Sequence, residues 1–144
     1  MFSVCSVVKK VFSAVKYPIM STPPVEIIQL PPSEWQAYRE LRLEALQDSP
    51  QAFGSTYPEQ LAKPEGFWQE RLADVARGED QWMVFARASG RLVGMLGAFR
   101  SDAHDSSVTD EAMIVAVYVT PAWRGKGVSS RLMSAILDVL KKSG

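Results

Sequence analysis

Hydrophobic positions along the chain follow two spacings, and the change from one to the other outlines the predicted elements. A first segment places them three or four residues apart, at Trp35, Tyr38, Leu41 and Ala45. This spacing predicts an amphipathic helix, which Ser33 and Gln36 would open as a capping box and which ends before Ser49. Residues 51–62 mix aromatic and turn-forming residues without a clean period, which predicts an irregular loop or a broken helix.

A second helix and a β-hairpin follow. The helix has Pro64 in its first turn and stops near Gly78, because proline suits the first turn of a helix and glycine suits the residue after its end. The chain then changes to apolar runs rich in strand-forming residues, at 81–87 and 91–100. Residues 88–90 join these runs through a short connection that contains glycine, which predicts a hairpin.

Two more strands and a last helix complete the pattern. Residues 25–30 form a short strand candidate, and residues 112–119 are almost wholly apolar, which favours a central strand buried on both faces. The helix is traced by apolar residues at helical spacing, Val128, Leu132, Ala135, Ile136 and Val139. Gly94 and Gly97 in the second hairpin strand predict a bulge. The order β, α, α, β, β, β, α indicates an α/β (α+β) fold with helices on the faces of a mixed sheet.

Composition narrows the classes of function. The 144 residues suffice for one domain. Sixteen basic residues balance sixteen acidic ones, so no overall field favours nucleic acid or an anionic membrane. The only cysteine is Cys5, which excludes an internal disulfide and the thiolate cluster of a structural zinc site. No apolar run reaches the roughly 18 to 20 residues that cross a bilayer. We therefore expect a cytoplasmic protein with no metal site, no nucleic-acid partner and no transmembrane segment.

The first 24 residues differ from the rest. They carry Lys9, Lys10 and Lys16 without an acid in the first twenty positions, and their valines recur at helical spacing. The favoured interpretation is a poorly ordered extension that precedes a domain at residues 25–144. An amphipathic surface helix or an organelle-targeting helix is the alternative.

The junction between the last strand and the last helix carries the candidate chemistry. First-turn amides of a helix lack internal partners and can donate to phosphate oxygens, which the helix dipole also favours. Gly125 and Gly127 let a phosphate approach the backbone and can adopt dihedral angles that are closed to other residues. Arg124 and Lys126 add positive charge. The sequence therefore predicts a diphosphate cradle. The spacing fits neither a Walker loop nor the dinucleotide-binding fingerprint.

At these residues the sequence resembles the GNAT superfamily of N-acetyltransferases, whose coenzyme A loop reads Arg/Gln-x-x-Gly-x-Gly/Ala after a strand and a proline. The run from Arg124 to Ser129 matches at every marked place except the last, where Ser129 replaces a glycine or alanine. The stretch from Leu41 to Tyr57 also looks like the first-helix region of many members. The resemblance implies a mixed, mostly antiparallel sheet flanked by helices, with acetyl-CoA as the cofactor.

The resemblance also implies site residues. The end of the last strand would pair with the pantetheine arm, and the loop amides would bind the pyrophosphate. The implied cofactor-binding residues are Val117, Tyr118, Val119, Arg124, Gly125, Lys126, Gly127, Val128, Ser129 and Ser130. Members often shape the acceptor pocket at the positions of Phe53, Tyr57 and Glu59.

Catalysis would need a base for the acceptor amine. Glu111 lies where many members keep the acidic residue that serves as this base, with Asp110 as a weaker substitute. A carboxylate at a strand entrance is also often just a solvated end residue, and His104 in the preceding polar loop is best explained as solvated. Members continue past the last helix with further strands and often a tyrosine acid. Because the chain ends at Gly144 with no tyrosine after Tyr118, we expect a truncated domain without the C-terminal strands and with no assigned general acid.

The resemblance thus implies an N-acetyltransferase that moves an acetyl group from acetyl-CoA to a primary amine of a small molecule or peptide. The alternative is a catalytically inactive module that binds coenzyme A or a partner protein, and a third hypothesis is an unstable fragment. An uncovered sheet edge makes a homodimer a further hypothesis.

Overall fold

The structure is a computed structural model that describes residues 24–100 and 112–143. Four strands form one sheet in the order β1-β2-β3-β4, and each pair of neighbours is antiparallel. The strands are β1 (Val25–Ile28), β2 (Gln81–Ala88), β3 (Arg91–Arg100) and β4 (Ala112–Val119). The α/β class and the hairpin are confirmed, while the segment proposed as an extension lies outside the described residues except for Pro24.

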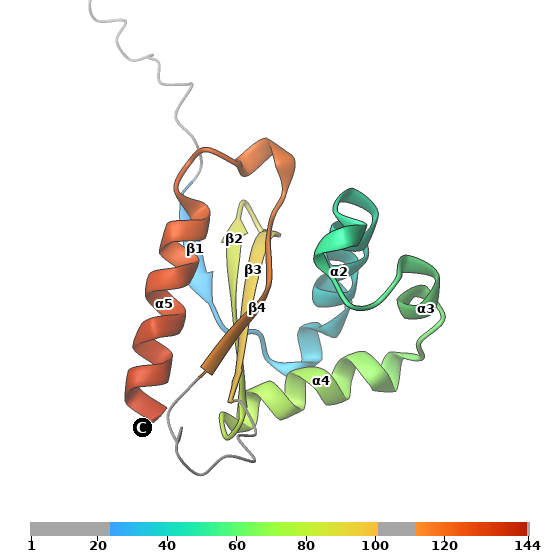
Figure 1. Cartoon of the computed structure of the whole chain (residues 1–144), viewed down its shortest axis with the longest axis horizontal. Coiled ribbons are helices and arrows are strands. Elements are labelled where there is room, and N and C mark those ends of the chain that lie inside the picture. The colour runs from blue at the N-terminus through green and yellow to red at the C-terminus, as the bar shows by residue number, and fades with distance from the viewer. Residues whose placement is uncertain (1–23, 101–111, 144) are drawn as a thin grey trace, which may run out of the picture.

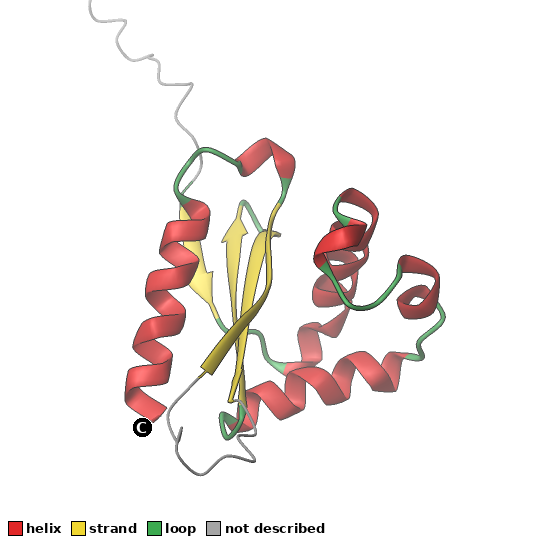
Figure 2. Ribbon diagram, viewed as in Figure 1, coloured by secondary structure: helices red, strands yellow, loops and turns green. Residues whose placement is uncertain are grey.

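Helices cover both faces of this sheet (Figures 1 and 2). They are α2 (Trp35–Asp48), α3 (Tyr57–Leu61), α4 (Glu65–Arg77) and α5 (Val128–Ser143). Helices α2 and α4 lie on one face, and α5 lies alone on the other among the described elements. In the described part of the chain, every helix is too short or too polar to cross a bilayer.

Each face of the sheet has its own apolar core. On the α2 and α4 face, the Tyr38 ring meets the rings of Trp68 and Phe85 edge to face, with centroids 5.5 and 5.8 Å apart. On the other face, Leu132 and Ile136 of α5 are fully buried against β2 and β3. Burial of apolar surface stabilises such cores, and the aromatic edge contacts add a smaller amount. The two cores fix α2 and α5 on either side of β4.

The start of α2 differs from the prediction. Ser33 does not cap the helix; it lies in the 3₁₀ turn Pro32–Glu34 that leads into it. The capping box forms at α3 instead, where Thr56 and Glu59 exchange hydrogen bonds between side chain and backbone. Proline at residue 32 favours the tight turn, because its fixed φ suits a first helical position. Proline also has no backbone N–H that would need an acceptor there. Two structures were predicted for residues 51–62, an irregular loop and a broken helix. The structure has the broken helix, as the 3₁₀ turn Pro50–Ala52 followed by α3.

The prediction that β4 is a central strand buried on both faces is wrong for the described residues. β4 is an edge strand that pairs with β3 alone, and its side chains at Met113 and Val117 are 53% and 44% exposed. An apolar run indicates that the side chains of a strand favour burial, but it does not show which element covers them. The outer edge of β4 therefore has no described strand beside it.

Irregular pairing occurs on β3 where its glycines predict it. The β2–β3 register shifts beside Gly94, and the β3–β4 register shifts between Met95 and Gly97. Opposite the second shift, Ala116 of β4 has a φ of +54°. A non-glycine residue rarely adopts this conformation, which costs of order 1–3 kcal/mol and occurs in turns and at functional sites. The bulge bends β4 just before its last residues.

Candidate functional site

The loop that joins β4 to α5 presents a row of free amides. After β4 the chain forms the 3₁₀ turn Pro121–Trp123, then a loop, and α5 begins at Val128. Among the described residues, the first backbone hydrogen bond of the helix runs from the Arg131 N–H to the Gly127 carbonyl, at 3.1 Å. No described acceptor receives the six preceding N–H groups, from Gly125 to Ser130. Such a row at the positive end of a helix of four turns is an anion-binding geometry.

Both glycines of this loop adopt the left-handed conformation that their identity allows. Gly125 has a φ of +77° and Gly127 a φ of +80°. A Cβ added at either position would meet no atom within 4 Å, so the need for glycine comes from the backbone angle and the space in front of the loop is open. The prediction that these glycines supply unusual dihedrals is confirmed.

Arg124 anchors the loop to helix α2. Its Nη2 donates to Asp48 Oδ2 at 2.6 Å, and its Nε donates to the Val119 carbonyl at 2.8 Å. The guanidinium also lies 5.6 Å from the centre of the Tyr118 ring. The Asp48 hydrogen bond raises the pKa of Arg124, and this bond, followed by one from Ser49, lowers the pKa of Asp48. Arg124 therefore positions the loop, while Lys126 is exposed and makes no ion pair with a described residue.

A second link between α2 and β4 passes through Glu44. Its Oε2 accepts from the Tyr118 hydroxyl at 2.7 Å and from Thr120 Oγ1 at 2.8 Å. Burial of Tyr118, and then its bond to Glu44, raise the pKa of its phenol well above the usual range. Tyr118 is consequently a neutral donor at physiological pH. The sequence pattern did not identify Glu44 or Asp48 as site residues. Their spacing of four residues places both carboxylates on one side of α2, and this spacing is the signal that could have linked them.

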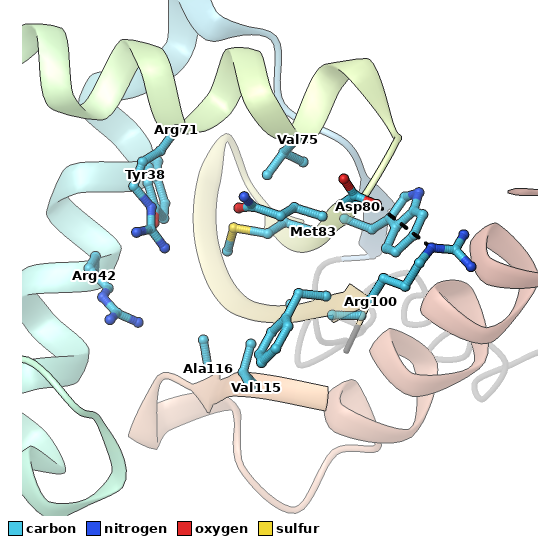
Figure 3. Close-up of a pocket in the computed structure, with 14 residues that line it drawn as sticks. Tyr38, Arg42, Arg71, Val75, Asp80, Met83, Arg100, Val115 and Ala116 are labelled. Atoms are coloured by element: carbon cyan, nitrogen blue, oxygen red, sulfur yellow. Dashed lines mark ion pairs between the residues drawn. The ribbon is translucent and has the colours of Figure 1, made fainter. Parts of the chain in front are cut away.

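A cleft opens beside β4 on the face covered by α2 and α4. Its volume is about 370 Å³, and its walls come from α2, α4 and strands β2 to β4 (Figure 3). Arg42 and Arg71 line it from the helices, and Val115 and Ala116 line it from β4. The same four residues also line an adjoining hollow that reaches Phe53 and Val117. Of the three positions expected to shape an acceptor pocket, Phe53 is therefore at the hollow.

The other two predicted acceptor positions are not among the residues that line the cleft or the hollow. Glu59 caps α3 through Thr56, and Tyr57 is the first residue of that helix. The candidate base Glu111, its substitute Asp110 and the histidine His104 all lie outside the described residues. Among the residues that the structure does describe, no cluster of His, Cys, Asp or Glu has the arrangement of a metal site.

The Arg124–Asp48 pair should keep the loop ordered above acidic pH. We expect Asp48→Asn to lower the backbone order parameters of residues 124–127 toward about 0.6, measured by ¹⁵N relaxation. Because the folded pKa of Asp48 is lowered, its contribution is present above the unfolded value of about 3.9 and disappears as the pH falls through the folded value. The parent protein should therefore lose loop order on acidification and Asp48→Asn should not respond. Unchanged order parameters at residues 124–127 in Asp48→Asn would refute the anchoring role, and Asp138→Asn on α5 is the control.

Comparisons with known proteins agree with this geometry. The family model described as "Acetyltransferase (GNAT) family" matches residues 35–144. No curated protein sequence gives a significant match. Among solved structures, the PaiA N-acetyltransferase from Thermoplasma acidophilum in complex with coenzyme A aligns with a TM-score of 0.65 at 16% identity, covering 84% of this chain and 74% of that one.

Two further structures show the same fold. A GNAT-family acetyltransferase from Streptococcus pneumoniae gives a TM-score of 0.67 at 15% identity, over 84% of this chain and 69% of that one. An aminoglycoside N-acetyltransferase in complex with coenzyme A gives a TM-score of 0.62 at 16% identity, over 88% and 75%. Together with the family model, which spans most of the sequence, these findings establish that the chain belongs to the GNAT family of acetyltransferases, whose enzymes use acetyl-CoA.

Proposed function

We propose that this chain binds acetyl-CoA at the β4–α5 junction and transfers its acetyl group to a primary amine. The observation that carries the proposal is the row of six backbone N–H groups, Gly125 to Ser130, without described acceptors at the start of α5. A pyrophosphate supplies several anionic oxygens, and charge-assisted bonds to backbone amides are stronger than neutral ones. Open space in front of Gly125 and Gly127 gives room for this group.

The end of β4 suits the amide-containing arm of the coenzyme. Val117 lies at the edge of the described sheet and is 44% exposed. Edge strands present unpaired N–H and C=O groups that an extended ligand can complete as though it were another strand. The bulge residue Ala116, which precedes this edge, lines both the cleft and the hollow. We therefore assign Val117, Tyr118 and Val119 to the arm and the loop to the phosphates.

The chemistry needs little from the protein beyond positioning and one base. Acetyl-CoA supplies an activated thioester when bound. The acceptor nitrogen forms a bond to the acetyl carbon as the carbon–sulfur bond breaks, and the amine proton passes to a base, for which Glu111 is our candidate. A thiol has a pKa near 8.5, so the departing sulfur can take its proton from solvent. Tyr118, whose pKa is raised and whose hydroxyl is held by Glu44, serves as a positioning group.

The acceptor is a small molecule or a peptide amine. The aminoglycoside N-acetyltransferase that shares this fold supports a small-molecule acceptor in general terms. The cleft and the adjoining hollow lie beside the end of β4, within reach of the place assigned to the arm.

A non-catalytic binding module is the second candidate. It is favoured by the exposed Met113 and Val117 on the outer edge of β4, because exposed apolar groups on an edge strand are typical of an interaction surface. Such a module would bind coenzyme A or a partner protein without turnover.

Thiol release separates the two candidates. With acetyl-CoA and a mixture of primary amines, the enzyme should release free thiol in proportion to acetylated product, and coenzyme A should raise the melting temperature. Saturation at 100 times the dissociation constant corresponds to about 2.7 kcal/mol of stabilisation. A melting shift without thiol release would favour the binding module. The absence of both a melting shift and thiol release would contradict acetyl transfer and coenzyme A binding, and would leave only a module that binds a partner protein.

A further inference from the structure

Two arginines face the cleft from different helices (Figure 3). Arg42 of α2 is only 8% exposed, and its Nε donates to Gln60 Oε1 at 3.1 Å. Its guanidinium carbon lies 4.6 Å from the centre of the Phe53 ring. Arg71 of α4 extends toward the same space, with its guanidinium 5.7 Å from the centre of the Phe67 ring. Both side chains are held in place by neutral groups.

Neither arginine has a carboxylate partner in the described part of the chain. The acid that lines the cleft, Asp80, is paired with Arg100, whose Nε lies 3.8 Å from Asp80 Oδ1, at the far end of the cleft from Arg42 (Figure 3). Burial lowers the pKa of Arg42, and the nearby charge of Arg71 lowers it further. A buried cation without a counter-ion is costly unless a ligand supplies the missing charge.

The position of this pair matters for the reaction. Arg42, Arg71, Val115 and Ala116 line both the cleft and the hollow that reaches Val117. The arginines therefore lie across from the bulge of β4, next to Val117, where the proposed function places the arm that carries the thioester. A guanidinium presents planar donors that match the oxygens of carboxylate and phosphate groups.

We infer that Arg42 and Arg71 bind an oxyanion on the acceptor, so that the acceptor is a small amine carrying a carboxylate or phosphate group. This inference rests on the proposed acetyl transfer and specifies its substrate class. A cleft of about 370 Å³ is within the size range of small-molecule sites. Polyamines and other polycationic acceptors are disfavoured, because their ammonium groups would face two uncompensated guanidinium groups.

Matched pairs of amines test the inference. We would compare tyrosine with tyramine, and O-phosphoethanolamine with ethanolamine, by thiol release from acetyl-CoA. In at least one pair, the member that carries the carboxylate or phosphate should have a kcat/KM about 10- to 100-fold above its partner without that group, since one or two charge-assisted hydrogen bonds are gained. The two pairs distinguish a carboxylate from a phosphate as the preferred anion. Equal turnover within both pairs would overturn the inference and leave the acetyl transfer standing.

Variants on α4 assign the preference to the arginine pair. Arg71→Gln should reduce the preference for the member that carries the anionic group to within about threefold, because Arg71 is exposed and its loss removes one cation from the cleft. Arg71→Lys, which keeps the charge, should retain part of the preference. Arg77→Gln, on the same helix but outside the cleft, is the control. An equal loss for both members of a pair in Arg71→Gln would show a structural role and overturn the inference.

A binding readout keeps the inference testable if acetyl transfer fails. In ¹H–¹⁵N spectra of the protein with coenzyme A, O-phosphoethanolamine or tyrosine should shift the side-chain Nε–Hε signals of Arg42 and Arg71, and ethanolamine should not. Such shifts without thiol release would refute the acetyl transfer and support the anion site. Absence of shifts for every anionic amine would refute the anion site, whatever the thiol assay shows.

Discussion

Gly127→Val is expected to weaken coenzyme A binding by at least about 100-fold, the equivalent of about 2.7 kcal/mol. Gly127 has a φ of +80°, which a β-branched residue cannot adopt without strain of order 1–3 kcal/mol. The loop would relax to a negative φ and turn the amides between Gly125 and Ser130 away from a common point. Each charge-assisted bond lost costs about 1.5–3 kcal/mol. Isothermal titration calorimetry with coenzyme A measures the effect.

The matched control is Gly66→Val on the surface of α4. Gly66 has no atom within 4 Å of an added Cβ and no positive φ, so valine is accommodated there and coenzyme A affinity should stay within about twofold. A Gly127→Val protein that melts like the parent yet binds coenzyme A with the parent's affinity would contradict the role of the loop.

Gly94→Ala is expected to destabilise the fold by about 1–3 kcal/mol and to weaken coenzyme A binding. An added Cβ at Gly94 would lie 3.2 Å from Leu132 Cδ1, 3.2 Å from the Tyr118 carbonyl oxygen and 3.3 Å from Val128 Cγ1. Overpacking of a closed core has this energetic scale. Because Val128 opens α5, the displacement also moves the first turn whose amides face the ligand. Urea unfolding and coenzyme A titration measure the two effects.

The neighbouring glycine of the same strand provides the comparison. A Cβ at Gly97 would make contacts of 3.5 Å with Met83 and Val115, which is ordinary packing, so Gly97→Ala should change the free energy of unfolding by less than about 0.5 kcal/mol. Equal stability of the two variants would show that α5 is not seated tightly on β3.

Local patterns in the sequence predict the elements around the site well. The bounds of β3 and β4 and the start of α5 follow from runs of apolar residues and from the glycines that separate them. The loop glycines were identified because their chemistry is local: a positive φ and an open face depend on neighbouring residues alone. The placement of β4 at an edge could not be predicted in this way, because it depends on which element lies beside the strand.

The sequence pattern could not predict contacts between residues that lie far apart in the chain. Asp48 and Arg124 are separated by 76 positions, as are Glu44 and Thr120. Their contact arises only when the two cores hold α2 against the end of β4. For the same reason the sequence did not predict that the Arg124 guanidinium donates to Asp48 and to the Val119 carbonyl. Arg42 and Arg71 came together through the packing of α2 and α4.

The central claim, that the amides at the start of α5 grip the pyrophosphate of the coenzyme, is tested most directly by backbone ¹H–¹⁵N spectra during titration. Coenzyme A should shift the amide signals of residues 125–130 strongly, and pantetheine, which lacks the pyrophosphate, should leave them in place while it shifts residues 117–119. If coenzyme A binds and the signals of residues 125–130 do not move, the account is wrong.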